Sequence, residues 1–412
     1  MNRKVYWPFA RACSAIFVVC LMGIGTISVS GPLVDVKAQS TLGGPLPNMT
    51  VAETALFTSG QRNFFKLWDP LHGLGPVFTN TACTNCHSQP VPGGNSPQKI
   101  TLFGTTNLDG SFNPLTNEGG PLLQPISVSR FLPACTLVGE SIPADATIVG
   151  QRLSPPTFGA GLINSIDQNS ILANAIDKGM GIHGTAGLVL DENGQSKVGR
   201  FGRKAQFADL LQFTSEALTH DLGVTSPLIA TEDLPQGQPI PPACATAAEP
   251  NDAAGKQLVA IFHFVEYLAP SNPGSPNVNG QALFNSIGCA LCHLPSYTTA
   301  PSVSVALDLN GKTLASKALS NQPVNLYSDL LLHDMGPGLA DNIVQGAATG
   351  SQWRTTPLWG LSLRTQYLHD GRTNNLTTAI NDHGGEAQQV IQTFNALPAS
   401  DQTDVLSFIS SL

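Results

Sequence analysis

One five-residue pattern occurs twice in this chain and limits its possible folds more than any other feature. Residues 83–87 read Cys-Thr-Asn-Cys-His, and residues 289–293 read Cys-Ala-Leu-Cys-His. Two thiols three positions apart lie next to each other on one helical turn, so both can form thioethers with the vinyl groups of one porphyrin. The histidine that follows can then bind the haem iron from the proximal side. The sequence therefore predicts two covalently attached c-type haems, held by Cys83, Cys86, His87, Cys289, Cys292 and His293.

Other uses of paired cysteines fit this pattern less well. A four-thiolate zinc site does not need the two trailing histidines, and the two pairs lie far apart in the chain. A thioredoxin-like redox motif is expected beside a βαβ pattern, which neither pair follows. A structural disulfide within each pair is the remaining alternative.

The N-terminus has the organisation of a secretory signal peptide. Arg3, Lys4 and Arg11 form a positive region, and residues 13–29 are uncharged and mostly apolar. Val36-Lys37-Ala38 offers a small-x-small cleavage site. We therefore expect residues 1–38 to be a signal peptide and the protein to be exported to the periplasm. An uncleaved anchor helix is the alternative, but the apolar run is short for a bilayer span. No later segment predicts a permanent membrane span.

Composition narrows the class of protein and of partner. The chain has 40 glycines and 31 prolines among 412 residues and only 12% charged residues, which indicates short elements joined by long loops. The formal net charge of −8 argues against nucleic-acid binding. It is compatible with a basic electron-transfer partner.

Two cysteines remain after haem attachment and signal cleavage. Cys135 and Cys244 both lie in proline-rich surroundings. In an oxidising compartment we expect them to form one disulfide, with two unrelated thiols as the alternative.

Apolar periodicity predicts a mainly α fold made of two cytochrome-c-like haem domains with long loops. The predicted helices cover residues 53–68, 168–178, 207–218, 253–268, 279–287, 376–382, 386–396 and 399–412, the last capped by Ser400. Short strands are predicted near residues 99–103 and 126–131, and residues 294–326 are predicted to be loop. The six prolines of residues 225–252 mark the connection between an N-terminal haem domain, 39–250, and a C-terminal haem domain, 251–412.

Several segments resemble the di-haem oxidoreductase family, whose members are also labelled thiol oxidoreductases or peroxidases. The matching segments are residues 199–205, 221–227, 330–341, 353–361, 367–372 and 383–387. The family is similar in turn to the bacterial di-haem cytochrome c peroxidases. The resemblance implies that electrons pass from the C-terminal to the N-terminal haem, which reduces hydrogen peroxide. It also implies a small soluble cytochrome or another periplasmic protein as electron donor.

The resemblance further implies ligands for the C-terminal haem. In the related peroxidases, one haem stores an electron at high potential because histidine and methionine ligate its iron. Met335 follows His293 at a distance that suits a loop folding over the far face of that haem, and we expect it to be the sixth ligand. His333 competes for this role, because the peroxidase methionine aligns nearer to residue 352. A packed core methionine is the structural alternative.

The N-terminal haem, ligated by His87, is then the expected peroxide site. The peroxidases place a catalytic glutamate in a segment that matches residues 218–223, where Asp221 takes its position. Asp221 is therefore the first candidate for the acid–base group, with Glu216 and His220 as neighbouring alternatives. Solvated groups at a helix end are the structural alternative for all three.

The remaining histidines and tryptophans have weaker assignments. His183 is a candidate sixth ligand that blocks the N-terminal haem at rest. His369 and His383 are candidates to bond haem propionates or the backbone. Trp353 and Trp359 are electron-relay candidates, with core packing as the alternative.

Three functions follow from this pattern. The first is a periplasmic di-haem peroxidase-like oxidoreductase. The second is a di-haem electron-transfer protein without peroxidase activity. The third is a di-haem oxidase that modifies a residue of a partner protein.

Overall fold

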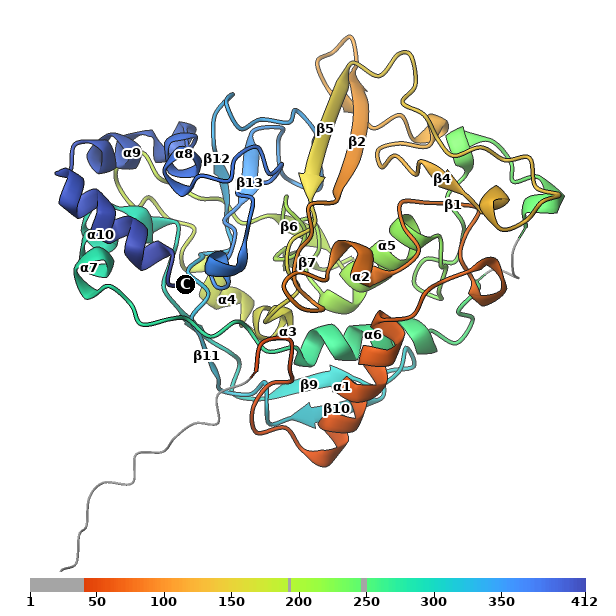
Figure 1. The fold of residues 1–412 in the computed structure, drawn as a ribbon, viewed down its shortest axis with the longest axis horizontal. Coiled ribbons are helices and arrows are strands. Elements are labelled where there is room, and N and C mark those ends of the chain that lie inside the picture. The colour runs from red at the N-terminus through yellow and green to blue at the C-terminus, as the bar shows by residue number, and fades with distance from the viewer. Residues whose placement is uncertain (1–40, 192–193, 246–249) are drawn as a thin grey trace, which may run out of the picture. The chain divides into compact units, whose positions relative to one another are not determined.

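The structure is a computed structural model that describes residues 41–191, 194–245 and 250–412. The predicted signal peptide, residues 1–38, lies outside the described residues. The described residues all belong to one compact unit by their contacts (Figure 1). The proposed division between 39–250 and 251–412 stays a prediction. None of the helices in the described part of the chain is both long enough and apolar enough to cross a bilayer.

The mainly α fold class is wrong. Helices make up 30% of the structure and strands 16%, and the strands form six small sheets within the described ranges. The α-helices are α1 (Val51–Phe64), α2 (Cys83–Cys86), α3 (Ala160–Asn164), α4 (Gln168–Leu172), α5 (Leu210–Leu222), α6 (Lys256–Tyr267), α7 (Val278–Ser286), α8 (Leu376–Asn381), α9 (Gln388–Asn395) and α10 (Ala399–Ile409). The strands are β1 (Val77–Phe78), β2 (Lys99–Thr106), β3 (Phe112–Asn113), β4 (Ile126–Ser127), β5 (Ile148–Leu153), β6 (Leu188–Leu190), β7 (Ser196–Val198), β8 (Tyr297–Thr298), β9 (Val303–Ala306), β10 (Thr313–Ser316), β11 (Pro323–Val324), β12 (Leu332–Asp334) and β13 (Gln352–Arg354).

Short antiparallel pairs account for the difference from the expected fold. The segment 294–326, predicted to be loop, contains β8 to β11, which pair as β9–β10 and β8–β11. Most of these strands have two to four residues, which is too short for an alternating pattern to stand out in the sequence. The longest pairing joins β2 to β5 over residues 99–104 and 148–153. The pair β12–β13 sets His333 opposite Trp353.

The central packing joins α1 to α6, which lie side by side in Figure 1. Helix α1 begins with a capping box in which the Thr50 side chain accepts from Glu53 N and the Glu53 carboxylate accepts from Thr50 N. The ring of Phe264 on α6 contacts Phe57 and Phe64 on α1 at centroid distances of 5.1 and 4.7 Å. At Gly60 an added Cβ would lie 2.2 Å from Ala260 O, so only glycine permits this close crossing.

Helix α5 carries the first catalytic candidates. The Asp209 carboxylate caps it by accepting from Leu211 N and Gln212 N. The helix ends at Gly223, whose positive φ of 65° suits glycine and brings the chain against Gly75. The main chain of residue 221 accepts hydrogen bonds from Thr79 N and Asn80 N, close to the first Cys-x-x-Cys-His motif.

The C-terminal helices agree with the predicted ranges within a few residues. Helix α7 packs on α10 through Phe284 and Phe408, whose ring centroids lie 5.3 Å apart. The predicted cap of α10 is wrong, because its N-cap position is Pro398 and not Ser400. The predicted disulfide is confirmed, since Cys135 and Cys244 are bonded to each other.

Candidate functional site

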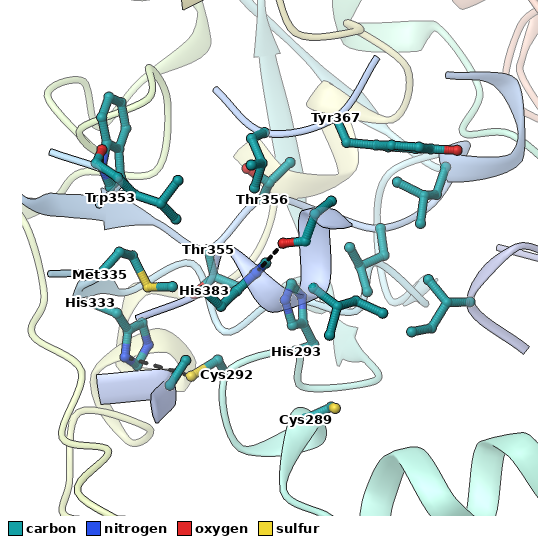
Figure 2. A pocket seen from close by; sticks show the side chains of 18 of the residues that line it. Cys289, Cys292, His293, His333, Met335, Trp353, Thr355, Thr356, Tyr367 and His383 are labelled. Atoms are coloured by element: carbon teal, nitrogen blue, oxygen red, sulfur yellow. Dashed lines mark hydrogen bonds between the residues drawn. The ribbon is translucent and has the colours of Figure 1, made fainter. Parts of the chain in front are cut away.

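A cavity of about 210 Å³ opens at the second Cys-x-x-Cys-His motif (Figure 2). The first three motif residues form the 3-10 helix Cys289–Leu291, and His293 N donates to Cys289 O at 3.0 Å. The residues that line the cavity include Cys289, Cys292, His293, Met335, Trp353, Leu358, Tyr367, His383, Ile391 and Phe394. This lining is mainly apolar, with the two thiols and the imidazole of the motif at its wall, as a porphyrin site requires.

The ring of His293 is held with one nitrogen free. Its Nδ1 lies 3.0 Å from Tyr327 O, and this hydrogen bond to a carbonyl places the proton on Nδ1. Burial, with a contribution from the imidazole of His383, lowers the pKa of His293 to about 4. The side chain is therefore neutral and keeps the Nε2 lone pair for an iron ion.

Three guanidinium groups at the same cavity lack acidic partners. Arg203, Arg354 and Arg364 line it and donate mainly to backbone carbonyls. None of them forms an ion pair with a carboxylate of the described residues, and Nε of Arg203 and of Arg364 is buried without a hydrogen-bond partner. Burial and the neighbouring arginines lower the pKa of Arg203 to about 9. The two propionates of a haem would supply the missing negative charge, so the residues at this site fit the group.

Two further side chains at this cavity carry possible iron ligands. His383 lies just after α8, and its Nδ1 lies 2.7 Å from Ala379 O, which confirms the expected backbone bond. Burial lowers the pKa of His383, so its imidazole is neutral. Met335 follows β12 and also lines the cavity. Ligation of iron by Met335 stays a prediction.

His333, the competing ligand, is bound on both ring nitrogens. Its Nδ1 lies 2.8 Å from Glu386 Oε2 and its Nε2 lies 3.0 Å from Asp329 Oδ2. Lys178 Nζ also donates to Asp329, at 2.6 Å. Against the effect of burial, the carboxylate of Asp329, the sulfur of Cys292 and the carboxylate of Glu386 raise the pKa of His333 to about 11, so the ring is protonated and offers no lone pair to a metal.

Trp353 lies between an imidazole and an ammonium group. Its ring stacks on His369 with centroids 3.8 Å apart, and Lys204 Nζ lies 3.7 Å from its centroid. Lys204 is fully buried, and its Nζ lies 3.4 Å from the carboxylate of Asp341, which also pairs with Arg152 at 2.6 Å. The indole N–H donates to Leu339 O. Trp353 is therefore a fixed wall of the cavity, and His369 packs on it.

The first motif has the same local geometry as the second. It forms α2, and His87 N donates to Cys83 O at 2.9 Å, as His293 N does to Cys289 O. The Nδ1 atom of His87 lies 3.3 Å from Gly94 O, and the main chain of Pro155 is a second hydrogen-bond partner of the ring. Burial and the nearby carboxylate of Asp221 raise the pKa of Cys83 to about 12 and of Cys86 to about 11. Both thiols are thus protonated and unpaired, as they would be before thioether formation.

Asp221 and Glu216 have different surroundings. Thr79 Oγ1 donates to Asp221 Oδ1 at 3.0 Å, and burial raises the pKa of Asp221. Glu216 instead pairs with His220 Nε2 at 2.9 Å, while His220 Nδ1 lies 2.7 Å from Asp233. These two carboxylates raise the pKa of His220 to about 10. Of the three candidates, Asp221 is the one whose charge also acts on the first motif.

The structure places one other histidine away from its predicted site. The main chain of His183 donates to Glu386, and Gly184 packs on His333, so His183 lies near the second motif. Its side chain is 63% exposed and does not fit the expected role of blocking the first haem. The two cysteine pairs do not join, and no group of three or more His, Cys, Asp or Glu suited to a metal ion occurs in the described ranges. A four-thiolate zinc site is therefore not formed.

Comparison with protein families finds a match that includes the second motif and begins after the first. A family model described as "Di-haem oxidoreductase, putative peroxidase" matches residues 138–412. No curated protein matches the chain.

Three solved structures are distantly similar to this chain. Hydrazine synthase of Kuenenia stuttgartiensis is 11% identical with a TM-score of 0.37, over 97% of this chain and 100% of that one. A MauG-like protein associated with microbial copper homeostasis is 14% identical with a TM-score of 0.37, over 89% of this chain and 92% of that one. A variant of the diheme peroxidase BthA from Burkholderia thailandensis is 12% identical with a TM-score of 0.36, over 91% and 89%.

Proposed function

The chain belongs to the di-haem oxidoreductase family, and on that premise we propose that it is an exported peroxidase carrying two covalently attached c-type haems. The first haem would be held by Cys83, Cys86 and His87, and the second by Cys289, Cys292 and His293. Electrons would enter at the second haem and reach hydrogen peroxide at the first. A small soluble cytochrome is the proposed donor, and its basic face would suit the acidic chain.

The observation that carries this proposal is the position of Asp221. Its carboxyl group is half-buried and receives a hydrogen bond from Thr79, and its charge acts on both thiols of the first motif. Reduction of hydrogen peroxide to two water molecules consumes two electrons and two protons. A haem supplies the iron that binds peroxide and the electrons that reduce it. The protein must supply the group that moves protons.

Asp221 is suited to hold and transfer that proton. Burial raises its pKa from the usual range of a carboxylic acid towards the working pH, where an acid–base group is most effective. The hydroxyl of Thr79 fixes one carboxylate oxygen, which leaves the other oxygen to exchange a proton with a bound substrate. The paired groups Glu216, His220 and Asp233 would hold the end of α5 in place and not act in the reaction.

The test is a haem count followed by a peroxide assay. Full-length protein should be produced in a host that exports it and attaches c-type haem, and its pyridine haemochrome should show two haems per chain. Replacing Cys83 and Cys86 with alanine should remove one haem, and replacing Cys289 and Cys292 should remove the other. The double variant Cys135→Ser/Cys244→Ser is the control and should keep both, because neither cysteine belongs to a motif.

The assay then separates an enzyme from an electron carrier. Half-reduced wild-type protein should oxidise a reduced small cytochrome when peroxide is added. If both haems stay low-spin in every redox state and no peroxide is consumed, the peroxidase proposal is wrong and an electron-transfer role replaces it.

A further inference from the structure

Besides His293, Tyr367 and His369, three side chains with an atom that can bind haem iron line the cavity at the second motif. They are His333, Met335 and His383, which all line it. Which of them binds iron decides the potential of the second haem, because a thioether raises that potential relative to an imidazole. This question rests on the proposed haem attachment at Cys289, Cys292 and His293.

We propose that His383 is the sixth ligand of the second haem, so that two imidazoles bind its iron. His383 has the same anchoring as His293, with Nδ1 bonded to a main-chain carbonyl at 2.7 Å in one case and 3.0 Å in the other. In both rings this bond leaves Nε2 for another partner. Both imidazoles line the same cavity. In Figure 2, His383 is drawn between Met335 and His293.

The main chain holds His383 at this place. His383 N donates to Ile380 O at the end of α8, and Ala379, which accepts from the ring, is buried. Both the ring and the backbone of His383 are therefore held at the end of α8. Little conformational entropy would be lost when such a side chain binds a metal.

The loop that follows His383 is fastened to β12. Glu386 accepts from Asp334 N with Oε1, and from His183 N and Gly184 N with Oε2, at 3.0 to 3.2 Å. Gly385 has a positive φ of 53°, and an added Cβ would lie 2.2 Å from Asp334 O. Only glycine fits at this crossing. The segment 383–386 is thus set in one position against the strand that precedes Met335.

The two competing residues are less suited to bind iron. Both ring nitrogens of His333 are bonded to carboxylates, so iron binding would leave Asp329 or Glu386 without its partner. The side chain of Met335 lines the cavity, but no hydrogen bond within the described residues orients its thioether, whereas the ring of His383 is oriented by its bond to Ala379 O. The backbone of Met335 also packs against Gly384, next to His383. The thioether of Met335 and the imidazole of His383 therefore extend from the same side of the cavity.

Spectroscopy of the holoprotein tests this assignment without reference to activity. Electron paramagnetic resonance and near-infrared magnetic circular dichroism of the oxidised wild type should give the signature of two imidazoles on the second haem. A His–Met signature would overturn the proposal. Since this measurement needs no variant, it remains decisive even where a substitution prevents folding.

Variants add a second, independent readout. His383→Gly should convert one low-spin haem per chain to high-spin, and added imidazole should restore the low-spin spectrum by filling the space left by the ring. His383→Met should raise the potential of the second haem. Met335→Leu and His369→Gln are the matched controls, because both alter side chains of the same cavity, and neither should change the spin state.

The haem count separates failure of this inference from failure of the proposed function. A chain with two haems, in which Met335→Leu and not His383→Gly gives a high-spin second haem, overturns the His383 assignment alone. A chain with no haem on Cys289 and Cys292 overturns the proposed attachment and the assignment with it.

Discussion

The ammonium group of Lys204 lies 3.7 Å from the centroid of the Trp353 ring, inside the protein and next to the haem cavity. The guanidinium of Arg152 lies 5.1 Å from the same ring. Removal of an electron from the indole would create a second positive charge beside Lys204. At an effective dielectric constant of 20, two unit charges about 4 Å apart repel each other by about 4 kcal/mol. We therefore expect Trp353 to act as a structural wall of the cavity and not as an electron relay.

The variant Trp353→Phe tests this reading. We expect electron transfer between the two haems to keep its rate, because phenylalanine preserves an aromatic ring against His369. The measurement is a stopped-flow record of the half-reduced protein after mixing with peroxide. A fall of about 100-fold in the rate of electron transfer, equivalent to about 2.7 kcal/mol of activation free energy, would show that the indole carries the electron.

Replacement of Asp221 should affect turnover without affecting potentials. Asp221→Asn keeps the size of the side chain and its contact with Thr79 but removes the exchangeable carboxyl proton. We expect peroxide turnover to fall by about 10²–10⁴, the usual scale for a lost acid–base group. Glu216→Gln is the matched control on the same helix. Its peroxide turnover should fall much less, since Glu216 is paired with His220. Equal losses in both variants would remove the special role of Asp221.

The pair His333–Glu386 should make stability depend on pH. The pKa of His333 is about 11 in the folded protein against 6.5 for a free histidine, so the folded state holds a proton that the unfolded state loses. The contribution of protonated His333 to the free energy of unfolding is complete below pH 6.5 and declines as the pH rises towards 11. The pKa of Glu386 is lowered to about 2, so its contribution is complete above pH 4.5 and is lost as the pH falls towards 2.

Urea unfolding of the variant Glu386→Gln measures this contribution. We expect a loss of about 2 kcal/mol at pH 6, the scale of a hydrogen bond to a charged group, and a smaller loss at pH 9. His333→Gln and the double variant complete a mutant cycle that isolates the pair from the Asp329 contact. A loss that grows from pH 6 to pH 9 would contradict the assigned protonation of His333.

The disulfide should stabilise the protein without affecting haem attachment. Cys135 and Cys244 are separated by 109 positions, and in the chain-entropy model a loop of that size contributes about 4–5 kcal/mol. Cys135→Ser/Cys244→Ser should therefore lower the free energy of unfolding by up to that amount, measured with denaturant. Non-reducing peptide mapping of the wild type should find the two cysteines linked. Two alkylatable thiols in the unreduced protein would rule the bond out.

Much of the helical framework could be predicted from sequence, because the longer helices have a clear apolar period. The predicted range 253–268 corresponds to α6 and 279–287 to α7, each within three residues. The strands escaped prediction because β8 and β11 have only two residues each. Such pairs depend on what the surrounding chain brings together, and not on a pattern of their own.

The candidate site likewise contains residues that the sequence could indicate and residues that it could not. The two Cys-x-x-Cys-His motifs could be singled out from sequence, since their local spacing marks them, and a family resemblance drew attention to Asp221, whose role stays a prediction. The hydrogen bonds of His333 with Asp329 and Glu386 could not be predicted, because 53 positions separate His333 from Glu386. The only signal was the segment 383–387, which drew attention to His383 but not to the carboxylate that fastens its loop. The three cavity arginines also gave no sequence pattern.

The contact between α1 and α6 has a consequence for how the protein is made. Phe64 lies beside His87, with ring centroids 6.3 Å apart, and Phe264 packs on Phe64 from the other half of the sequence. During synthesis and secretion, the first motif therefore emerges long before the helix that completes the wall behind it. A chain released at residue 250 would expose Phe57 and Phe64 to solvent and to proteases, even if a haem were already joined to Cys83 and Cys86.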